Sequence, residues 1–304
     1  MPDAEAAASQ LETVRDFLRW ALSSFAEAKI AHGHGTTSAL DEAAFIILET
    51  LHLPVDDINP WLDARLLEPE RRRLAELIRD RVILRKPAAY LMKRIYIRGI
   101  PFYVDERVIV PRSYIGELMM SGLFAGEASL SGDPERVGAV LDLCTGSGCL
   151  AILAANTFPN ADIDAVELSA DALEVARINV DDHDLVNRIN LLRGDLFDPV
   201  EGQTYDVIIC NPPYVAEAEV EAFAPEYAHE PVMAHLGGED GLDLVRRILA
   251  ESAAHLNPGG GLLCEIGTGR GILEDEFPQL DFLWLDTEES EGEVFWITRE
   301  ALEG

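Results

Sequence analysis

Short apolar runs alternate with helix-like segments over the second half of the chain, and this alternation restricts its fold more than any other feature. The runs that look like buried strands are 137–143, 163–166, 189–192, 207–210 and 261–266. Segments with helical patterns separate several of them, namely 149–158, 170–182 and 241–255. Strands connected through helices pair in parallel, with helices on both faces of the sheet. The sequence therefore predicts an α/β fold with a doubly wound, mostly parallel sheet.

The end of the chain breaks this alternation. Two runs rich in aromatic residues, 282–285 and 294–298, are joined by the acidic loop 286–293 without an intervening helix. Strands joined by a loop alone pair antiparallel. We therefore expect a terminal hairpin that puts one antiparallel strand into the sheet, and a catalytic domain that covers residues 136–304.

Residues 1–90 are predicted to form a small helical domain. An amphipathic helix is expected over 9–28, because its apolar residues recur every three or four positions. A second helix follows the capping cluster 36–38, and a third covers 69–84. The histidines of this region have no acidic or cysteine partners nearby in the sequence, so we assign it no chemistry. Packing and substrate docking are the expected roles.

Residues 91–135 are predicted to form a β-hairpin followed by a connector. The hairpin arms are the β-rich runs 95–97 and 102–110, which flank a glycine. A helix capped by Ser113 is expected over 113–124. The stretch 126–135, rich in glycine, serine and acids, is typical of an exposed connector.

The charge balance limits the partners. Lys and Arg total 24 against 55 Asp and Glu, for a formal net charge of −31. A broad footprint on duplex DNA needs a basic face, so direct DNA binding is not expected. Complementary fields would favour a basic protein partner. The alternative is that the acids only solvate the surface.

The composition also bears on location and on metals. The chain has no apolar run of membrane-spanning length, and its start lacks the basic residues of a signal peptide, so a cytoplasmic protein is expected. Its four cysteines are Cys144, Cys149, Cys210 and Cys264. They lie in or beside apolar stretches without metal-binding spacing, and no metal site is predicted.

Asn211-Pro212-Pro213-Tyr214 follows the strand-like run 205–210 directly. Two successive prolines offer no NH donor and fix φ near about −65°, so the strand must end there on a stiff segment, which we call the ledge. The Asn211 amide oxygen and a proline carbonyl can accept both hydrogens of a planar NH2 group, while the Tyr214 ring packs on its plane. On four residues alone, a simple turn is an equally good interpretation.

Three features are placed to bind a cofactor at the carboxyl ends of the strands. The loop 142–148 carries two glycines between the first strand and its helix. Glu167 ends the second strand, where a carboxylate can accept two hydrogen bonds from a ribose diol. Asp195 follows the third strand and can accept from an adenine amino group while Leu196 or Phe197 covers the ring. A tight strand-to-helix turn and a turn cap are the alternative interpretations of the loop and of Asp195.

A nicotinamide-dependent enzyme would share the glycine loop and Glu167. However, the loop lacks the third glycine of the full dinucleotide fingerprint. Hydride transfer also gives no role to the ledge or to the terminal hairpin. Together these features favour a methyl donor.

The motifs 142–152, 211–214, 229–231 and 238–244 resemble those of class I S-adenosylmethionine methyltransferases that modify amide or amino nitrogens. Within that group the chain is similar to the bacterial glutamine methyltransferases, and the resemblance covers nearly all of it. One branch methylates a glutamine of peptide release factors, the other a glutamine in the third protein of the large ribosomal subunit. The release-factor branch usually continues its Pro-Arg element with Pro-Glu-Thr-Glu. Here Pro-Arg is followed by Ser-Tyr-Ile-Gly-Glu, and residues 102–112 likewise resemble the ribosomal-protein branch.

This resemblance implies a Rossmann-like fold with a mixed seven-stranded sheet and S-adenosylmethionine as the cofactor. The implied reaction is methyl transfer to a glutamine side-chain nitrogen of a basic ribosomal protein, without a strong base. The expected catalytic residues are Asn211, Pro212, Pro213 and Tyr214. The expected cofactor-binding residues are Asp142, Thr145, Gly146, Ser147, Gly148, Glu167, Asp195, Leu196 and Asn211.

Three alternatives stay open at this point. The first is a glutamine methyltransferase that acts on peptide release factors. The second is a DNA adenine methyltransferase, which uses a similar ledge to hold a flipped base. The third is an assembly factor that binds the cofactor but catalyses nothing.

Overall fold

The computed structural model describes residues 3–124, 129–288 and 290–304, which group into two compact units. The first unit consists of Met1–Tyr96, Val104–Glu106 and Phe223–Glu230. The second consists of Ile97–Tyr103, Arg107–Ala222 and Pro231–Gly304. The predicted boundaries assign the segment Phe223–Glu230 to the catalytic domain, whereas compactness groups it with the helices. The roles predicted for 1–90, 91–135 and 136–304 stay predictions.

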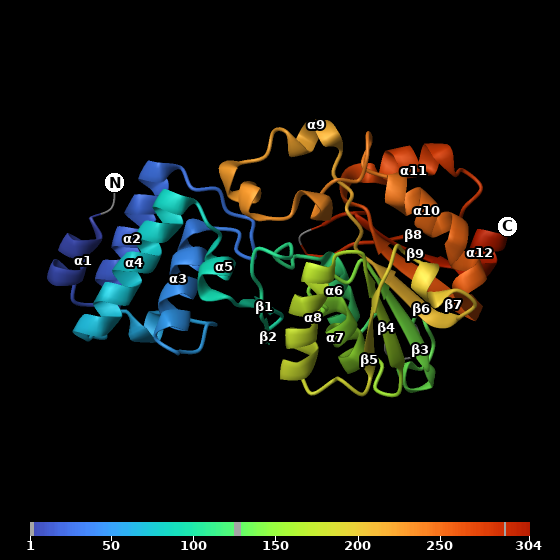
Figure 1. The fold of residues 1–304 in the computed structure, drawn as a ribbon, viewed down its shortest axis with the longest axis horizontal. Helices are drawn as coiled ribbons and strands as arrows, with labels where there is room; N and C mark the ends of the chain where they lie inside the picture. Colours follow the sequence, from blue (N-terminus) through green and yellow to red (C-terminus); the bar gives the residue numbers. More distant parts are fainter. Residues whose placement is uncertain (1–2, 125–128, 289) are drawn as a thin grey trace. The chain divides into compact units, whose positions relative to one another are not determined.

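The first unit is helical (Figure 1). Its helices are α1 (Ala4–Gln10), α2 (Val14–Ala28), α3 (Ala39–Thr50), α4 (Glu68–Leu84) and α5 (Ala88–Met92). Helix α3 begins at the predicted capping cluster, where the Ser38 side chain accepts a hydrogen bond from Asp41 N. The helix expected over 9–28 is present as α2 and ends where expected, but it begins at Val14, and residues 9 and 10 belong to α1 instead. The chain breaks between α1 and α2 because Thr13 and Asp16 form a capping box, in which each side chain accepts from the other's backbone NH.

Buried ion pairs tie Phe223–Glu230 to these helices. Arg81 of α4 and Glu42 of α3 are fully buried, with Arg81 Nε 2.5 Å from Glu42 Oε1. Glu226 is also fully buried and accepts from Arg85 Nη1 at 2.6 Å and from Ala31 N at 3.1 Å. A buried carboxylate needs such donors to offset its lost hydration. The Glu226 carboxylate therefore fixes this segment within the first unit.

The second unit is built on a sheet with the strand order β5-β4-β3-β6-β7-β9-β8 (Figure 1). Its strands are β3 (Ala139–Leu143), β4 (Asp162–Glu167), β5 (Ile189–Arg193), β6 (Tyr205–Cys210), β7 (Leu256–Glu265), β8 (Leu283–Leu285) and β9 (Val294–Thr298). Strands β3 to β7 pair in parallel, and β9 is antiparallel to both of its neighbours. The predicted mixed seven-stranded sheet and the terminal hairpin are confirmed.

Helices cover both faces of this sheet (Figure 1). Helices α6 (Tyr114–Met120), α7 (Cys149–Thr157) and α8 (Ala170–Asp182) lie on one face. Helices α10 (Asp243–Ser252), α11 (Arg270–Glu276) and α12 (Arg299–Glu303) lie on the other.

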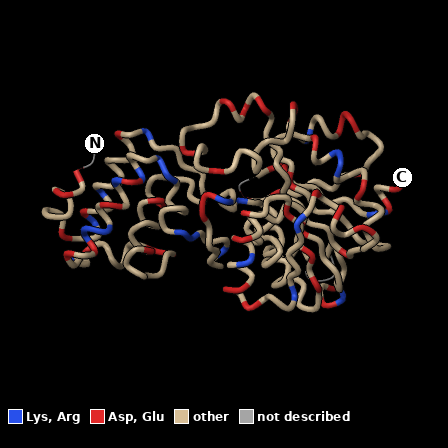
Figure 2. Tube along the Cα trace, in the orientation of Figure 1, with Lys and Arg blue, Asp and Glu red and all other residues tan. Residues whose placement is uncertain are grey.

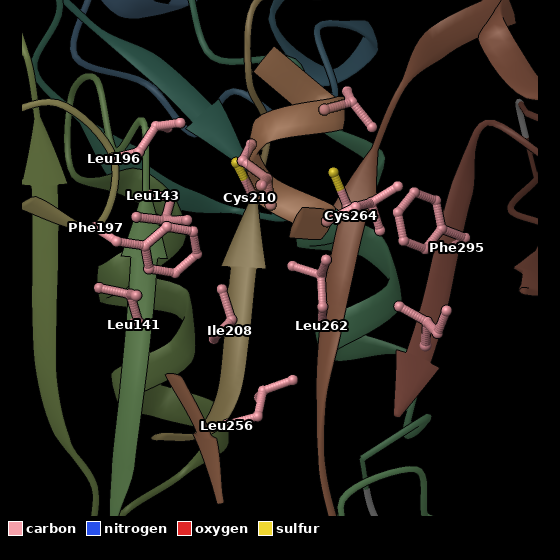
Figure 3. Packing of buried hydrophobic residues seen from close by; sticks show 14 of the residues in the cluster. Leu141, Leu143, Leu196, Phe197, Ile208, Cys210, Leu256, Leu262, Cys264 and Phe295 are labelled. Carbon is pink, nitrogen blue, oxygen red and sulfur yellow. The ribbon is translucent and has the colours of Figure 1, made fainter. Parts of the chain in front are cut away.

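Figure 3 shows alternate residues of neighbouring strands, such as Leu141, Ile208 and Leu262, packed side by side on the second face. Strands buried on both faces have no polar side, which explains the continuous apolar runs in the sequence.

The predicted hairpin is shorter than expected. Strands β1 (Ile95–Ile97) and β2 (Ile100–Phe102) turn at Arg98 and Gly99, which both have positive φ. The second arm was expected to extend to Val110 and ends instead at Phe102. Its ladder stops because the Asn179 side chain of α8 takes both backbone groups of Tyr103, with Oδ1 2.7 Å from Tyr103 N and Nδ2 3.0 Å from Tyr103 O.

The helix predicted over 113–124 begins as expected, with Ser113 as its N-cap, but α6 ends at Met120. Residues 126–128 of the predicted connector and Glu289 of the acidic loop lie outside the described residues. In the part of the chain that the structure describes, no helix is long and apolar enough to cross a lipid bilayer. Within the same part, no group of His, Cys, Asp and Glu is arranged to hold a metal ion.

Candidate functional site

A pocket of the second unit lies at the carboxyl ends of β3, β4, β5 and β6, where parallel sheets of this kind bind ligands. Residues that follow these four strands line it together, and they include Cys144, Gly146, Glu167, Leu168, Gly194, Asp195, Leu196, Asn211 and Pro213. Pro231, Met233 and Ala234 close another side. Of the predicted site residues, Gly146, Glu167, Asp195, Leu196, Asn211 and Pro213 therefore share one cavity.

Three alternate residues of the glycine loop have the left-handed backbone conformation. Cys144, Gly146 and Gly148 have φ values of 59°, 56° and 79°. Gly148 also lets α7 start against α8, because a Cβ atom there would lie 3.2 Å from Ala176 Cβ. The loop is therefore a tight strand-to-helix turn, as the alternative interpretation had it, and this turn also brings Gly146 to the pocket wall.

Four residues of the loop that were predicted to bind the cofactor do not line the pocket, namely Asp142, Thr145, Ser147 and Gly148. Asp142 is fully buried and accepts a hydrogen bond from Thr145 Oγ1. Burial raises the pKa of the Asp142 carboxyl to about 7. The Ser147 carbonyl accepts from Asn179 Nδ2 at 2.8 Å. These residues hold the shape of the loop.

Glu167 lines the pocket and accepts hydrogen bonds from two backbone NH groups. Its Oε2 accepts from Gly146 N at 3.0 Å, and its Oε1 accepts from Ser169 N at 2.9 Å. Burial raises the pKa of the Glu167 carboxyl, and these backbone donors oppose that rise. Each carboxylate oxygen has a further lone pair, so both can still accept from a ligand hydroxyl.

Asp195 and Leu196 form the wall after β5. The Asp195 carboxylate lies 2.9 Å from Arg247 Nη2 in an exposed ion pair, a partner that the sequence did not reveal. Leu196 is buried with a φ of 46° and lines the pocket. Phe197 does not line it, because its ring stacks on His255 with centroids 4.6 Å apart. Of the two residues considered for covering an adenine ring, the structure brings Leu196 to the pocket.

The segment 235–241 packs against the backbone of the ledge and of Val215, which follows it. Val215 N donates to His235 O at 2.9 Å, and Gly237 N donates to Val215 O at 2.9 Å. A Cβ atom on Gly237 would lie 2.8 Å from Pro213 O, and one on Gly241 would lie 2.3 Å from Tyr214 O. Contacts this short do not occur between real Cβ atoms and backbone oxygens. Gly241 of the 238–244 motif and the preceding Gly237 therefore let the chain pack directly on the ledge.

Tyr214 is not among the residues that line the pocket, and its side chain is fixed at two points. Its hydroxyl donates to Glu265 Oε1 at 2.8 Å, and a Cβ atom on Gly267 would lie 2.7 Å from its ring. Glu265 is the last residue of β7 and is 1% exposed. Sequence analysis missed Glu265, although an acid that ends an otherwise apolar strand is a signal that could have revealed it.

Comparison with known proteins decides the family of this chain. Residues 129–227 match the family model described as the methyltransferase small domain. The protein named ribosomal protein uL3 glutamine methyltransferase from Bradyrhizobium diazoefficiens is 56% identical over 97% of this chain and 93% of its own length. The chain belongs to the family of ribosomal protein uL3 glutamine methyltransferases. Relatives of the same name are 50% identical in Bordetella pertussis and 52% identical in Neisseria meningitidis serogroup B.

The Bordetella match covers 96% of this chain and 97% of the relative, and the Neisseria match covers 98% and 97%. The helical unit of this methyltransferase therefore lies within the shared length, as does the unit that carries the pocket. Membership of the family confirms the resemblance drawn from the four motifs and from residues 102–112. The roles of the individual site residues stay predictions.

The segment that follows the ledge in the sequence of this methyltransferase is acidic. Residues 214–243 contain no Lys or Arg, and their acids include the exposed Glu217, Glu221 and Glu239. Figure 2 shows this loop, which carries α9 (Glu217–Val220), with red segments and no blue ones. The local charge after the ledge therefore has the same sign as the net charge of the whole chain.

Proposed function

We propose that this methyltransferase transfers a methyl group from S-adenosylmethionine to the side-chain amide nitrogen of a glutamine in ribosomal protein uL3. The observation that carries the proposal is the shared pocket. Asn211 and Pro213 of the ledge line the same cavity as Gly146 and Glu167, two of the predicted cofactor-binding residues. A group held by the ledge would therefore face a donor held by the loop. The name of the relatives supplies the substrate.

The residues around the pocket fit S-adenosylmethionine. Glu167 and Asp195 can accept from hydroxyl and amino groups, and Val166 and Leu196 offer apolar surface to a flat ring. Gly146 has no side chain to obstruct a ligand at the loop. When bound, this cofactor supplies an electrophilic methyl group on a positively charged sulfonium.

The chain's own contribution is to hold the amide nitrogen still. An amide is a weak nucleophile because its lone pair is delocalised. The Asn211 side-chain oxygen and the Pro212 carbonyl would accept the two amide hydrogens, and the Tyr214 ring would pack on the amide plane. Positioning and fixed dipoles then supply most of the rate, with the proton leaving the nitrogen late, to solvent.

Substrate choice is proposed to come from outside the ledge. The ledge suits any planar NH2 group, so it cannot by itself distinguish ribosomal protein from release factor or adenine. We assign docking to the helices of residues 1–90 and to the hairpin segment 95–112. The acidic surface would favour a basic substrate such as a ribosomal protein, and the reaction would take place in the cytoplasm, where ribosomes assemble.

The test is methyl incorporation from a labelled donor into uL3, a peptide release factor and DNA, offered separately. We expect label only in uL3, on one glutamine identified by mass spectrometry. Asn211→Ala should bind the cofactor nearly normally in calorimetry and lose about 100-fold or more in turnover. Preferred labelling of release factor or DNA would replace the assignment by one of those substrates. An inactive wild-type protein that binds the cofactor would favour the assembly factor.

A further inference from the structure

One buried carboxylate, that of Glu265, joins three segments that lie far apart in the sequence. Its Oε1 accepts from Tyr214 Oη at 2.8 Å. Its Oε2 accepts from Ser113 Oγ at 2.6 Å and from Tyr114 N at 2.9 Å. These partners are 51, 152 and 151 residues away along the chain. All of these residues belong to the second unit.

These partners come from two segments with different roles in the proposed reaction. Tyr214 is the last residue of the ledge. Ser113 and Tyr114 directly follow Pro111-Arg112, at the point where the sequence departs from the release-factor branch. Ser113 Oγ also accepts from Ile115 N at 3.2 Å and so caps α6 while donating to Glu265. The carboxylate thus connects the ledge with the residues that directly follow the hairpin segment 95–112, to which we assign docking.

The arrangement leaves the Tyr214 ring little freedom. The ring lies against Gly267, where no side chain fits, and its hydroxyl is anchored at Glu265. Because the hydroxyl oxygen lies on the axis about which the ring turns, its hydrogen bond fixes where the ring lies, and the close backbone at Gly267 restricts how far the ring plane can turn. An apolar residue in the place of Glu265 would avoid the cost of burying a carboxylate, but it would release all three donors.

We propose that Glu265 is a positioning residue that fixes the position of the Tyr214 ring and the start of α6 in one geometry for methyl transfer. The inference rests on the proposed function, since it concerns the orientation of the same ledge. Glu265 does not line the cofactor pocket, so it acts through Tyr214 and Ser113. Its loss should therefore affect turnover and substrate use and leave cofactor affinity unchanged.

Glu265→Gln is the main variant, because it keeps the shape of the side chain and replaces one acceptor by a donor. We expect kcat to fall by about 10- to 100-fold, as for a reacting group misplaced by a fraction of an ångström to 1 Å. The cofactor dissociation constant should stay within about two-fold of wild type. Tyr214→Phe should lower kcat as well, and the double variant should be no slower than Glu265→Gln alone, because both changes break one contact. Ser113→Ala should mainly raise the KM for uL3.

Matched controls exist at the other end of the sheet. Tyr205 Oη donates to Asp164 Oδ2 at 2.7 Å, far along the strands from the pocket. Tyr205→Phe and Asp164→Asn remove the same kind of contact and should leave kcat and KM unchanged. Ser252 is buried, with Oγ donating to Ile248 O at 2.6 Å, and Ser252→Ala serves as the control for Ser113→Ala.

A second measurement does not depend on activity. Tyr114 N donates to a buried acceptor in the wild type, so hydrogen exchange in the peptide that contains it should be slow and should accelerate in Glu265→Gln. A wild-type kcat in Glu265→Gln would overturn the proposal, as would additive losses in the double variant or unchanged exchange at Tyr114. Failure of the wild type to methylate uL3 would refute the proposed function instead, and the exchange result would still judge the role of Glu265.

Discussion

Gly237→Ala should disable the ledge through a change at a residue that does not itself line the pocket. A Cβ atom at this position would lie 2.3 Å from Gly241 O and 2.8 Å from Pro213 O. Both obstacles are backbone atoms, so no side chain can turn aside. Reaching the 3.4 Å of ordinary contact requires the chain to part by about 1 Å at this point, and overpacking of this kind costs ~1–3 kcal/mol of stability. Because Pro213 O is part of the ledge, a displacement of that size should also lower kcat by roughly 100-fold.

The assay compares this variant with Gly271→Ala in α11, where an added Cβ meets nothing within 4 Å. Urea unfolding gives the stability change, calorimetry gives cofactor affinity, and labelled-donor turnover gives kcat. Gly237→Ala should lose stability and kcat while it retains cofactor affinity within a few-fold, and Gly271→Ala should match the wild type in all three. A Gly237→Ala variant with normal turnover would show that the ledge does not need its backing, and the steric argument would be refuted.

Three further changes test other parts of the structure. Glu167→Ala should weaken cofactor binding by about 1.5–3 kcal/mol, because it removes a charged acceptor from the pocket wall, and saturating cofactor should restore much of the rate; unaltered affinity in calorimetry would contradict the assignment. Glu226→Ala leaves Arg85 and the buried Arg81 without this carboxylate and should destabilise the helical unit by about 3–5 kcal/mol in urea unfolding, whereas the exposed Glu221→Ala should have little effect. Burial raises the pKa of Asp142 to about 7, so the folded state binds more protons than the unfolded state between about pH 4 and pH 7. The contribution of this group to the free energy of unfolding should therefore fall as pH rises through that window, and Asp142→Asn should flatten the slope; an unchanged pH profile in the variant would show that another group titrates there.

The sequence by itself determined the local conformations and the main chemistry of this protein. The periods of apolar residues gave the strands and helices of the second unit, because burial on two faces or on one stripe leaves a pattern within ten to twenty residues. The loop 142–148 and the ledge were recognisable for the same reason. Glycine and proline restrict the backbone where they stand, and no distant partner is needed to recognise a left-handed turn or a strand that must end.

Only the tertiary structure decided which side chains meet across long stretches of chain. The hairpin arm ends at Phe102 because Asn179, 76 residues beyond Tyr103, takes the backbone groups that a ladder would use. Glu226 belongs with helices that precede it by some 140 residues, through its bond to Arg85. Glu265 looked like an ordinary acid at the end of a strand until the fold placed Tyr214 and Ser113 against it. The period of the apolar residues indicates which positions are buried. The partner of a buried polar group depends instead on the order of the strands and the path of the loops.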